Sequence, residues 1–114
     1  MTKKELSELL HSVGIPVNEG ISSDENMNKY PRIVYWPYAE QDEMASGEDY
    51  HNIVTYQISF WSRTPQHEKF KELREKLRKI GQHPLFKHEY VENDPIFART
   101  WHTYFGLDVI EDGE

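Results

Sequence analysis

The sequence contains no cysteine. This absence excludes thiol catalysis, thiolate metal sites and a disulfide framework within these 114 residues. The chain also lacks any apolar run near the roughly 20 residues that a membrane-spanning helix requires, and its first residues lack the apolar core of a signal peptide. Its six glycines are scattered and form no dinucleotide-binding or P-loop pattern. We therefore expect a cytoplasmic protein without a membrane anchor or a phosphate-binding loop.

Basic residues are outnumbered, with 13 Lys and Arg against 20 Asp and Glu and a formal net charge of −7. Such a surface repels phosphate backbones, which argues against specific nucleic-acid binding. The charge is uneven, because residues 68–79 carry six bases and three acids, a net +3. The remaining residues carry 7 bases and 17 acids, a net −10. A chain of this length predicts a single domain, which we place at residues 1–110.

The most informative stretch lies between residues 50 and 80. A half-buried strand is predicted from Tyr50 to Trp61, because apolar side chains on one face (Val54, Tyr56, Ile58, Phe60) alternate with polar ones on the other (Thr55, Gln57, Ser59). An amphipathic helix should follow, because Phe70, Leu73, Leu77 and Ile80 recur at helical spacing. Thr64 is expected to cap this helix, with Pro65 at its first position.

The other elements are predicted from their boundary residues. A first helix should run from Thr2, the start of a capping box with Glu5, to about Ser12, before Gly14. A strand is expected at residues 32–36 between two prolines, followed by an acidic loop at 38–49. A short strand starting at Ile15 or Val17 is an option. Residues 86–92 and 96–110 should form a hairpin, and 111–114 a disordered acidic tail.

This order of elements predicts an α+β fold. The expected architecture is a mainly antiparallel four-stranded sheet with two helices packed on it, in the order helix, strand, strand, helix, strand, strand. Aromatic residues are 13% of the chain, so its core should rely on Trp, Tyr and Phe.

No pattern in the sequence supports catalysis or a cofactor. The six histidines match no zinc signature, although His51 and His102 could meet across neighbouring strands. Ser46 and Ser62 lie in no nucleophile-elbow context. The carboxylates at Glu89 and Glu92 are explained by a solvated turn. We therefore expect neither an enzyme nor a bound cofactor or metal.

Two oppositely charged segments are candidates for an interface between copies of the chain. A solvated surface is the alternative explanation for both. Complementary surfaces on one small domain favour head-to-tail contacts, which close into rings or extend as filaments. The candidate residues are an acidic set (Glu40, Asp42, Glu43, Glu48, Asp49) and a basic helical set (Lys69, Arg74, Lys76). Aromatic residues around Pro31 and Pro37 are also typical of either a core or an interface patch.

The order of these segments resembles a known family. The segments are Tyr30-Pro-Arg-Ile-Val-Tyr-Trp36, the acidic stretch, the strand at residues 50–62, the helix at 70–80, and Ala98-Arg-Thr-Trp-His-Thr-Tyr-Phe-Gly-Leu107. Together, over nearly the whole chain, they are similar to the small tail-completion or tail-terminator proteins of tailed bacteriophages and prophages.

The resemblance implies a non-catalytic α+β structural protein that works as a ring of identical subunits, typically a hexamer. Such a ring caps the tail tube, stops its polymerisation and provides the surface that joins it to the head. The implied partners are tail-tube and head-connector proteins, without cofactors or a membrane. The implied location is the cytoplasm during assembly and then the virion. The main alternative is a bacterial protein-binding adaptor of α+β fold with no phage role, and a small enzyme is a third possibility.

Overall fold

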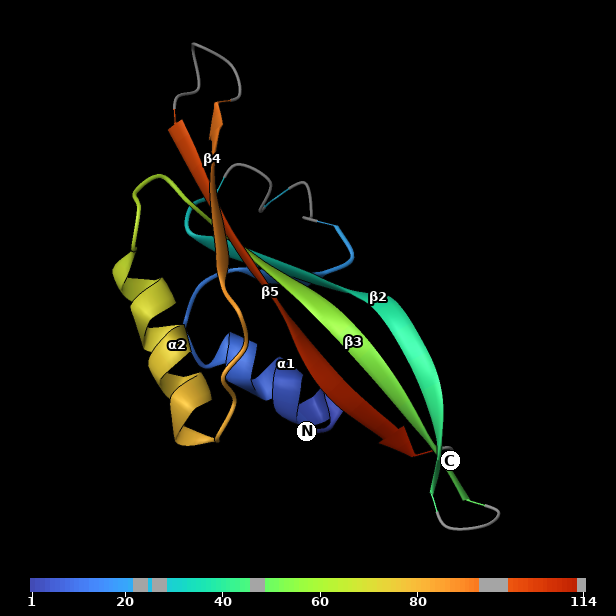
Figure 1. Cartoon of the computed structure of the whole chain (residues 1–114). Helices are drawn as coiled ribbons and strands as arrows, with labels where there is room; N and C mark the ends of the chain where they lie inside the picture. The colour runs from blue at the N-terminus through green and yellow to red at the C-terminus, as the bar shows by residue number, and fades with distance from the viewer. Residues whose placement is uncertain (22–24, 26–28, 46–48, 93–98, 113–114) are drawn as a thin grey trace.

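The computed structural model describes residues 1–21, 25, 29–45, 49–92 and 99–112. This part of the chain forms two helices and a five-stranded sheet (Figure 1). The elements are α1 (Lys3–His11), β1 (Val17–Glu19), β2 (Arg32–Ala45), β3 (Asp49–Ser62), α2 (Glu68–Lys79), β4 (Lys87–Glu92) and β5 (Arg99–Asp112).

The sheet is mixed, with the strand order β1-β2-β3-β5-β4. β1 pairs with β2 in parallel, and the other three pairs are antiparallel. The prediction of a four-stranded, mainly antiparallel sheet with two strands before α2 is therefore wrong, although the α+β class is correct. The added strand has three residues, and backbone bonds from Ile33 N–H to the Pro16 carbonyl and from Gly20 N–H to the Tyr35 carbonyl hold it on β2.

The acidic stretch after Trp36 is a strand rather than the predicted loop. β2 continues through it to Ala45 and pairs with β3 down to Asp49. The register shifts between Pro37 and Ala39, a bulge that lets the ladder pass a proline. β5 likewise includes Glu111 and Asp112, the first two residues of the tail expected at 111–114, and residues 113–114 lie outside the described residues.

The first helix forms as its sequence predicts. The Thr2 side chain accepts from Glu5 N–H at 3.1 Å, and the Glu5 carboxylate accepts from Thr2 N–H at 3.3 Å, which completes the capping box. Gly14 has a φ of 80°, the left-handed conformation expected just beyond the helix. The helix buries Leu6 and Leu10 against the sheet.

The second helix starts later than predicted. Its N-cap is His67, whose ring nitrogen Nδ1 accepts from Lys69 N–H at 3.0 Å, and not Thr64. The segment before it forms a turn in which the Ser62 hydroxyl donates to the Thr64 carbonyl at 2.7 Å. The helix buries Phe70, Leu73 and Leu77 and ends before Gly81, as expected.

Both helices lie on one face of the sheet, and the core fills the space between these layers (Figure 1). The sheet residues in this core alternate along the three long strands; they are Ile33, Tyr35, Val54, Tyr56, Ile58, Phe60, Phe105, Leu107 and Val109. No helix of the described chain covers the opposite face, which we call the open face. The molecule is elongated, with extents of 57 × 28 × 22 Å, because the three long strands project past the helices.

Candidate functional site

The projecting end of the three long strands concentrates negative charge. We call this end the acidic arm and define it as residues 39–45 of β2, 49–55 of β3 and 107–112 of β5. The sequence of these segments holds seven acidic residues and no Lys or Arg. Glu40, Asp42 and Glu43 are exposed. The arm therefore presents a strongly negative surface to any molecule that approaches it.

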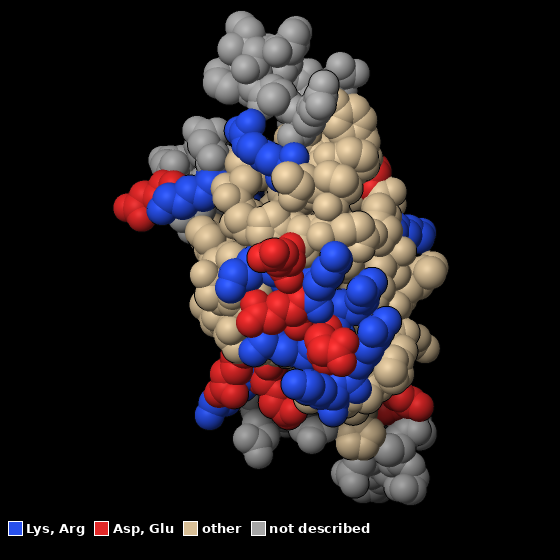
Figure 2. Space-filling model, turned by 90° about the vertical axis from the view of Figure 1, so that its left-hand side faces the viewer, with Lys and Arg blue, Asp and Glu red and all other residues tan. Residues whose placement is uncertain are grey.

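The exposed side of α2 carries the opposite net charge. Figure 2 shows Lys and Arg side chains gathered on the helical side of the molecule, with acidic side chains between them. Ion pairs within the helix join Lys69 to Glu72 and Arg78 to Glu75, each at 3.4 Å. Arg74 is half-buried, and its Nε atom is buried without a hydrogen-bond partner among the described residues. The helix thus keeps a positive surface although its own acids neutralise part of it.

The predicted interface residues fall into two separate places. Glu40, Asp42 and Glu43 lie on β2 in the acidic arm, and Asp49 is the first residue of β3. Glu48 lies outside the described residues. The basic set, Lys69, Arg74 and Lys76, lies on α2. In Figure 1 the arm and α2 occupy opposite sides of the molecule, so one copy does not bring the two sets together.

The open face carries a polar network that the sequence did not reveal. His102 on β5 contacts the Glu89 carboxylate through Nδ1 at 2.7 Å and the Ser59 hydroxyl through Nε2 at 2.8 Å. The ring is stacked on Trp61, with centroids 4.0 Å apart, and on Tyr104, with centroids 4.9 Å apart. Three neighbouring strands therefore contribute to a single serine–histidine–glutamate chain. His51 pairs with Asp112 at the other end of β3, so it does not meet His102.

This order of groups is the one that activates a serine nucleophile in hydrolases. A nucleophile must, however, reach its substrate, and Ser59 is fully buried at 0% exposure. Ser59 also lies in the middle of a regular strand rather than on a turn that would expose its hydroxyl. The geometry therefore fits a structural network that satisfies buried polar groups and fixes the stacked rings.

A serine substitution tests this structural interpretation. Ser59→Ala is expected to lower the free energy of unfolding by about 1–3 kcal/mol, because it leaves the His102 ring nitrogen unpaired in a buried position. Urea denaturation measures this loss. A fluorophosphonate probe should leave Ser59 unmodified in the native wild-type protein. Modification of native Ser59, lost in Ser59→Ala, would show instead that the serine is a reactive nucleophile.

A second cluster lies where β2 begins and β3 ends. The Arg32 and Arg63 guanidinium groups lie 4.7 and 4.6 Å from the centroid of the Tyr30 ring, and Arg32 also lies 5.6 Å from the Trp61 ring. Burial alone would raise the pKa of the Tyr30 phenol. Hydrogen bonds with Arg32 and Thr100, together with the two positive charges, outweigh burial and lower this pKa below its ordinary value. Cation–π contacts of this kind fix aromatic and arginine side chains.

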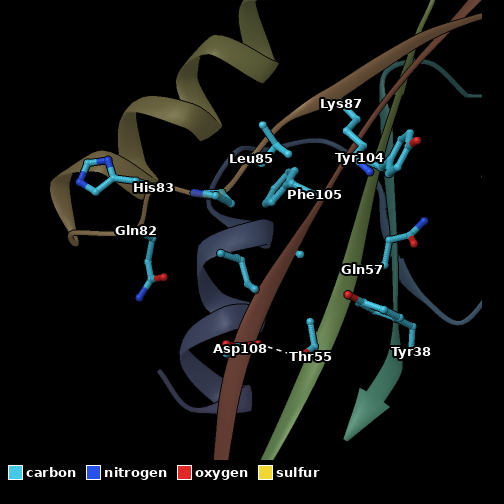
Figure 3. A pocket seen from close by; sticks show the side chains of 13 residues that line it. Tyr38, Thr55, Gln57, Gln82, His83, Leu85, Lys87, Tyr104, Phe105 and Asp108 are labelled. Atoms are coloured by element: carbon cyan, nitrogen blue, oxygen red, sulfur yellow. Dashed lines mark hydrogen bonds between the residues drawn. The ribbon is translucent and has the colours of Figure 1, made fainter.

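A pocket of about 590 Å³ lies at the side of β5 (Figure 3). Its floor is β5 from Tyr104 to Asp108, and one wall is the segment Gln82–Leu85 that leads to β4. Tyr38 and Gln57 line the opposite side. The Thr55 hydroxyl donates to the Asp108 carboxylate at 2.6 Å, which holds that carboxylate at the pocket.

In the described ranges, no three His, Asp or Glu side chains converge as ligands for a metal ion. Neither of the helices described here is long and apolar enough to cross a membrane. No protein-family model matches the sequence, and neither does any curated protein.

Proposed function

We propose that this chain is a non-catalytic structural protein of a tailed phage or prophage, which completes the tail and helps to join it to the head as a ring of identical subunits. The observation that carries the proposal is the separation of charge between the acidic arm and α2. The arm holds seven acids without a Lys or Arg, and α2 has a net +3. A ring of head-to-tail contacts needs two different, complementary surfaces on each subunit.

The resemblance of the segment order to tail-completion proteins supplies the biological context for this ring. An elongated subunit with a three-stranded arm suits contacts that reach a neighbour, because the arm projects beyond the subunit's own core. The acidic surface also suits a channel for DNA, since it repels phosphate rather than binding it. The alternative function is an adaptor that binds another protein, and the pocket beside β5 is the feature that favours it.

The decisive measurement is the mass and shape of the purified protein across concentration. Light scattering on a sizing column and negative-stain imaging should show a ring of several subunits with a central hole, alone or on added tail tubes. Molar salt should dissociate the ring, because the distance over which exposed charges interact falls from about 8 Å at physiological ionic strength to about 3 Å at 1 M salt. A protein that stays monomeric at every concentration and does not bind tail tubes would contradict the proposal and favour the adaptor.

A further inference from the structure

The outer edge of β5 is only partly covered. β4 pairs with this edge from Arg99 to Tyr104. Beyond Tyr104, β5 continues to Asp112 with β3 on its inner side but without β4 on its outer side. Near its end the Ile110 N–H donates outward to the Met1 carbonyl at 2.9 Å. Alternate residues of a strand direct their backbone groups to the same side, so the N–H and C=O groups of Gly106 and Asp108 also point outward, like those of Ile110. Within the described residues, no backbone group pairs with these two N–H groups.

The pocket lies directly along this uncovered edge. The segment Gln82–Leu85 stands away from β5 and leaves the pocket between them, as Figure 3 shows. Leu85 is 76% exposed and Tyr38 is 60% exposed, so each side of the edge offers a large side chain for contact. The free stretch from Phe105 to Val109 is about 17 Å long at roughly 3.3 Å per residue, the length of an ordinary strand. The site therefore has the shape that an added strand would fill.

The other long edge of the sheet is protected against such pairing, whereas this one is not. The outer edge of β2 beyond β1 contains Pro37, a bulge and several exposed acids, which are features that prevent strand addition. The β5 stretch contains neither proline nor lysine, and its second residue is Gly106. Gly106 has no side chain, and a Cβ atom at this position would lie 3.4 Å from the Thr55 methyl group and 3.9 Å from the Tyr38 ring.

From this edge and its charge we infer that an extended, lysine- or arginine-bearing segment of a partner protein binds along Phe105–Val109 as an additional strand. Backbone groups of Gly106 and Asp108 would bond to it, in the manner of other strand-addition complexes. Side chains on one face of the added strand would lie beside the Asp108 carboxylate, which favours a cation, whereas the Tyr104 ring already has Lys87 over it at 6.0 Å. Those on the other face would lie beside Leu85 and Phe105, which favour an apolar residue.

Charge selects this partner over a second copy of the chain. The free edges that another copy could offer are its acidic arm, which contains no Lys or Arg, and its terminal strands β1 and β4, whose sequences each carry a net charge of −1. Pairing two such edges would bring like charges together, which destabilises cross-strand neighbours. A basic segment is instead attracted by the acidic arm, of which Asp108 is a part. The edge shares residues 107–109 with the acidic arm, but its partner is an extended segment rather than helix α2 of another copy, so peptide binding and ring formation are measured separately.

A peptide titration tests the inference with the full chain. The probe is a capped hexapeptide that alternates lysine and valine. It should protect the Gly106 and Asp108 amides from hydrogen exchange and shift their NMR signals. Asp108→Asn should weaken its affinity about tenfold, a factor equivalent to about 1.4 kcal/mol. The matched control Asp42→Asn removes the same charge from an exposed arm residue on β2 and should change affinity much less.

Two altered peptides separate strand addition from simple charge attraction. A peptide that is N-methylated at its two central residues keeps its side chains and charge but lacks a backbone donor on either side of the strand, and it should bind at least about tenfold more weakly. A block peptide of three lysines followed by three valines keeps the charge but loses the alternation, and it should also bind more weakly. Equal affinity for all three peptides, or no response at Gly106 and Asp108, would overturn the inference. Protection of these amides that rises with protein concentration, without peptide, would assign the edge to a second copy.

Discussion

Replacing Phe70 with alanine is expected to lower the free energy of unfolding by about 3–5 kcal/mol. The Phe70 side chain is 1% exposed and is the largest fully buried side chain of α2. Its ring packs edge-on against Phe86 at 5.3 Å and at a tilt against Phe60 at 5.7 Å. Removal of the ring leaves a cavity between α2, β3 and the segment before β4. The decrease in the free energy of unfolding therefore exceeds the transfer free energy of the missing atoms.

Urea denaturation of three variants measures this effect. Phe70→Leu keeps most of the apolar volume and should cost about 1.5 kcal/mol or less. Lys71→Ala changes the next residue, which is exposed, and should remain within about 0.5 kcal/mol of the wild type. A cost for Phe70→Ala below about 1 kcal/mol would show that α2 does not pack on the sheet as described.

The elements that depend on local chemistry were predictable from the sequence. The capping box of α1 requires only Thr2 and Glu5 at the correct spacing, and both hydrogen bonds are present. The alternation along β3 correctly predicted which of its side chains enter the core, because one face is buried and the other is not. Phe70, Leu73 and Leu77 were also identified from their spacing, although Ile80, predicted on the same stripe, is 51% exposed.

The elements that depend on partners distant in sequence were not predictable. The acidic end of β2 has no apolar alternation, and it is a strand because β3 pairs with it from Asp49 to Thr55. β1 begins at Val17, one of the two starting points that the sequence left open, but three residues are too few for a periodic signal, and the strand exists because β2 offers it a parallel edge. The cap of α2 was misassigned because Thr64-Pro65 has a favourable pattern, whereas the backbone turns there and the helix begins after His67.

The same distinction applies to the candidate sites. The charges of the arm and of α2 were visible in the sequence, but their positions on opposite sides of one molecule required the fold. The network of Glu89, His102 and Ser59 joins β4, β5 and β3, and only the strand register brings the three together. The free edge of β5 follows from the difference in length between β5 and β4, which the predicted hairpin of residues 86–92 and 96–110 did not specify.

Reversing charge on the acidic arm is expected to weaken subunit assembly without unfolding the subunit. Glu40 and Glu43 are exposed on β2, so lysine at both positions should leave the melting temperature nearly unchanged. Each reversal would turn an attraction of roughly 0.5 kcal/mol into a repulsion of similar size. Two reversals then cost about 2 kcal/mol for each contact, which weakens association roughly thirtyfold. Light scattering across concentration, with and without tail tubes, measures this change.

Matched variants identify the surface that receives the arm. Glu8→Lys makes the same single reversal on an exposed part of α1 and should assemble like the wild type, in contrast to Glu43→Lys. If α2 is the receiving surface, Lys69→Glu with Lys76→Glu should also weaken assembly on its own. Combined with the arm reversal, these changes restore opposite charges across each contact and should recover most of the lost affinity. Recovery by this swap would establish head-to-tail contacts between the two surfaces, because a merely destabilised subunit cannot be rescued by charge at a distant helix. Normal assembly of Glu43→Lys would instead remove the arm from the interface.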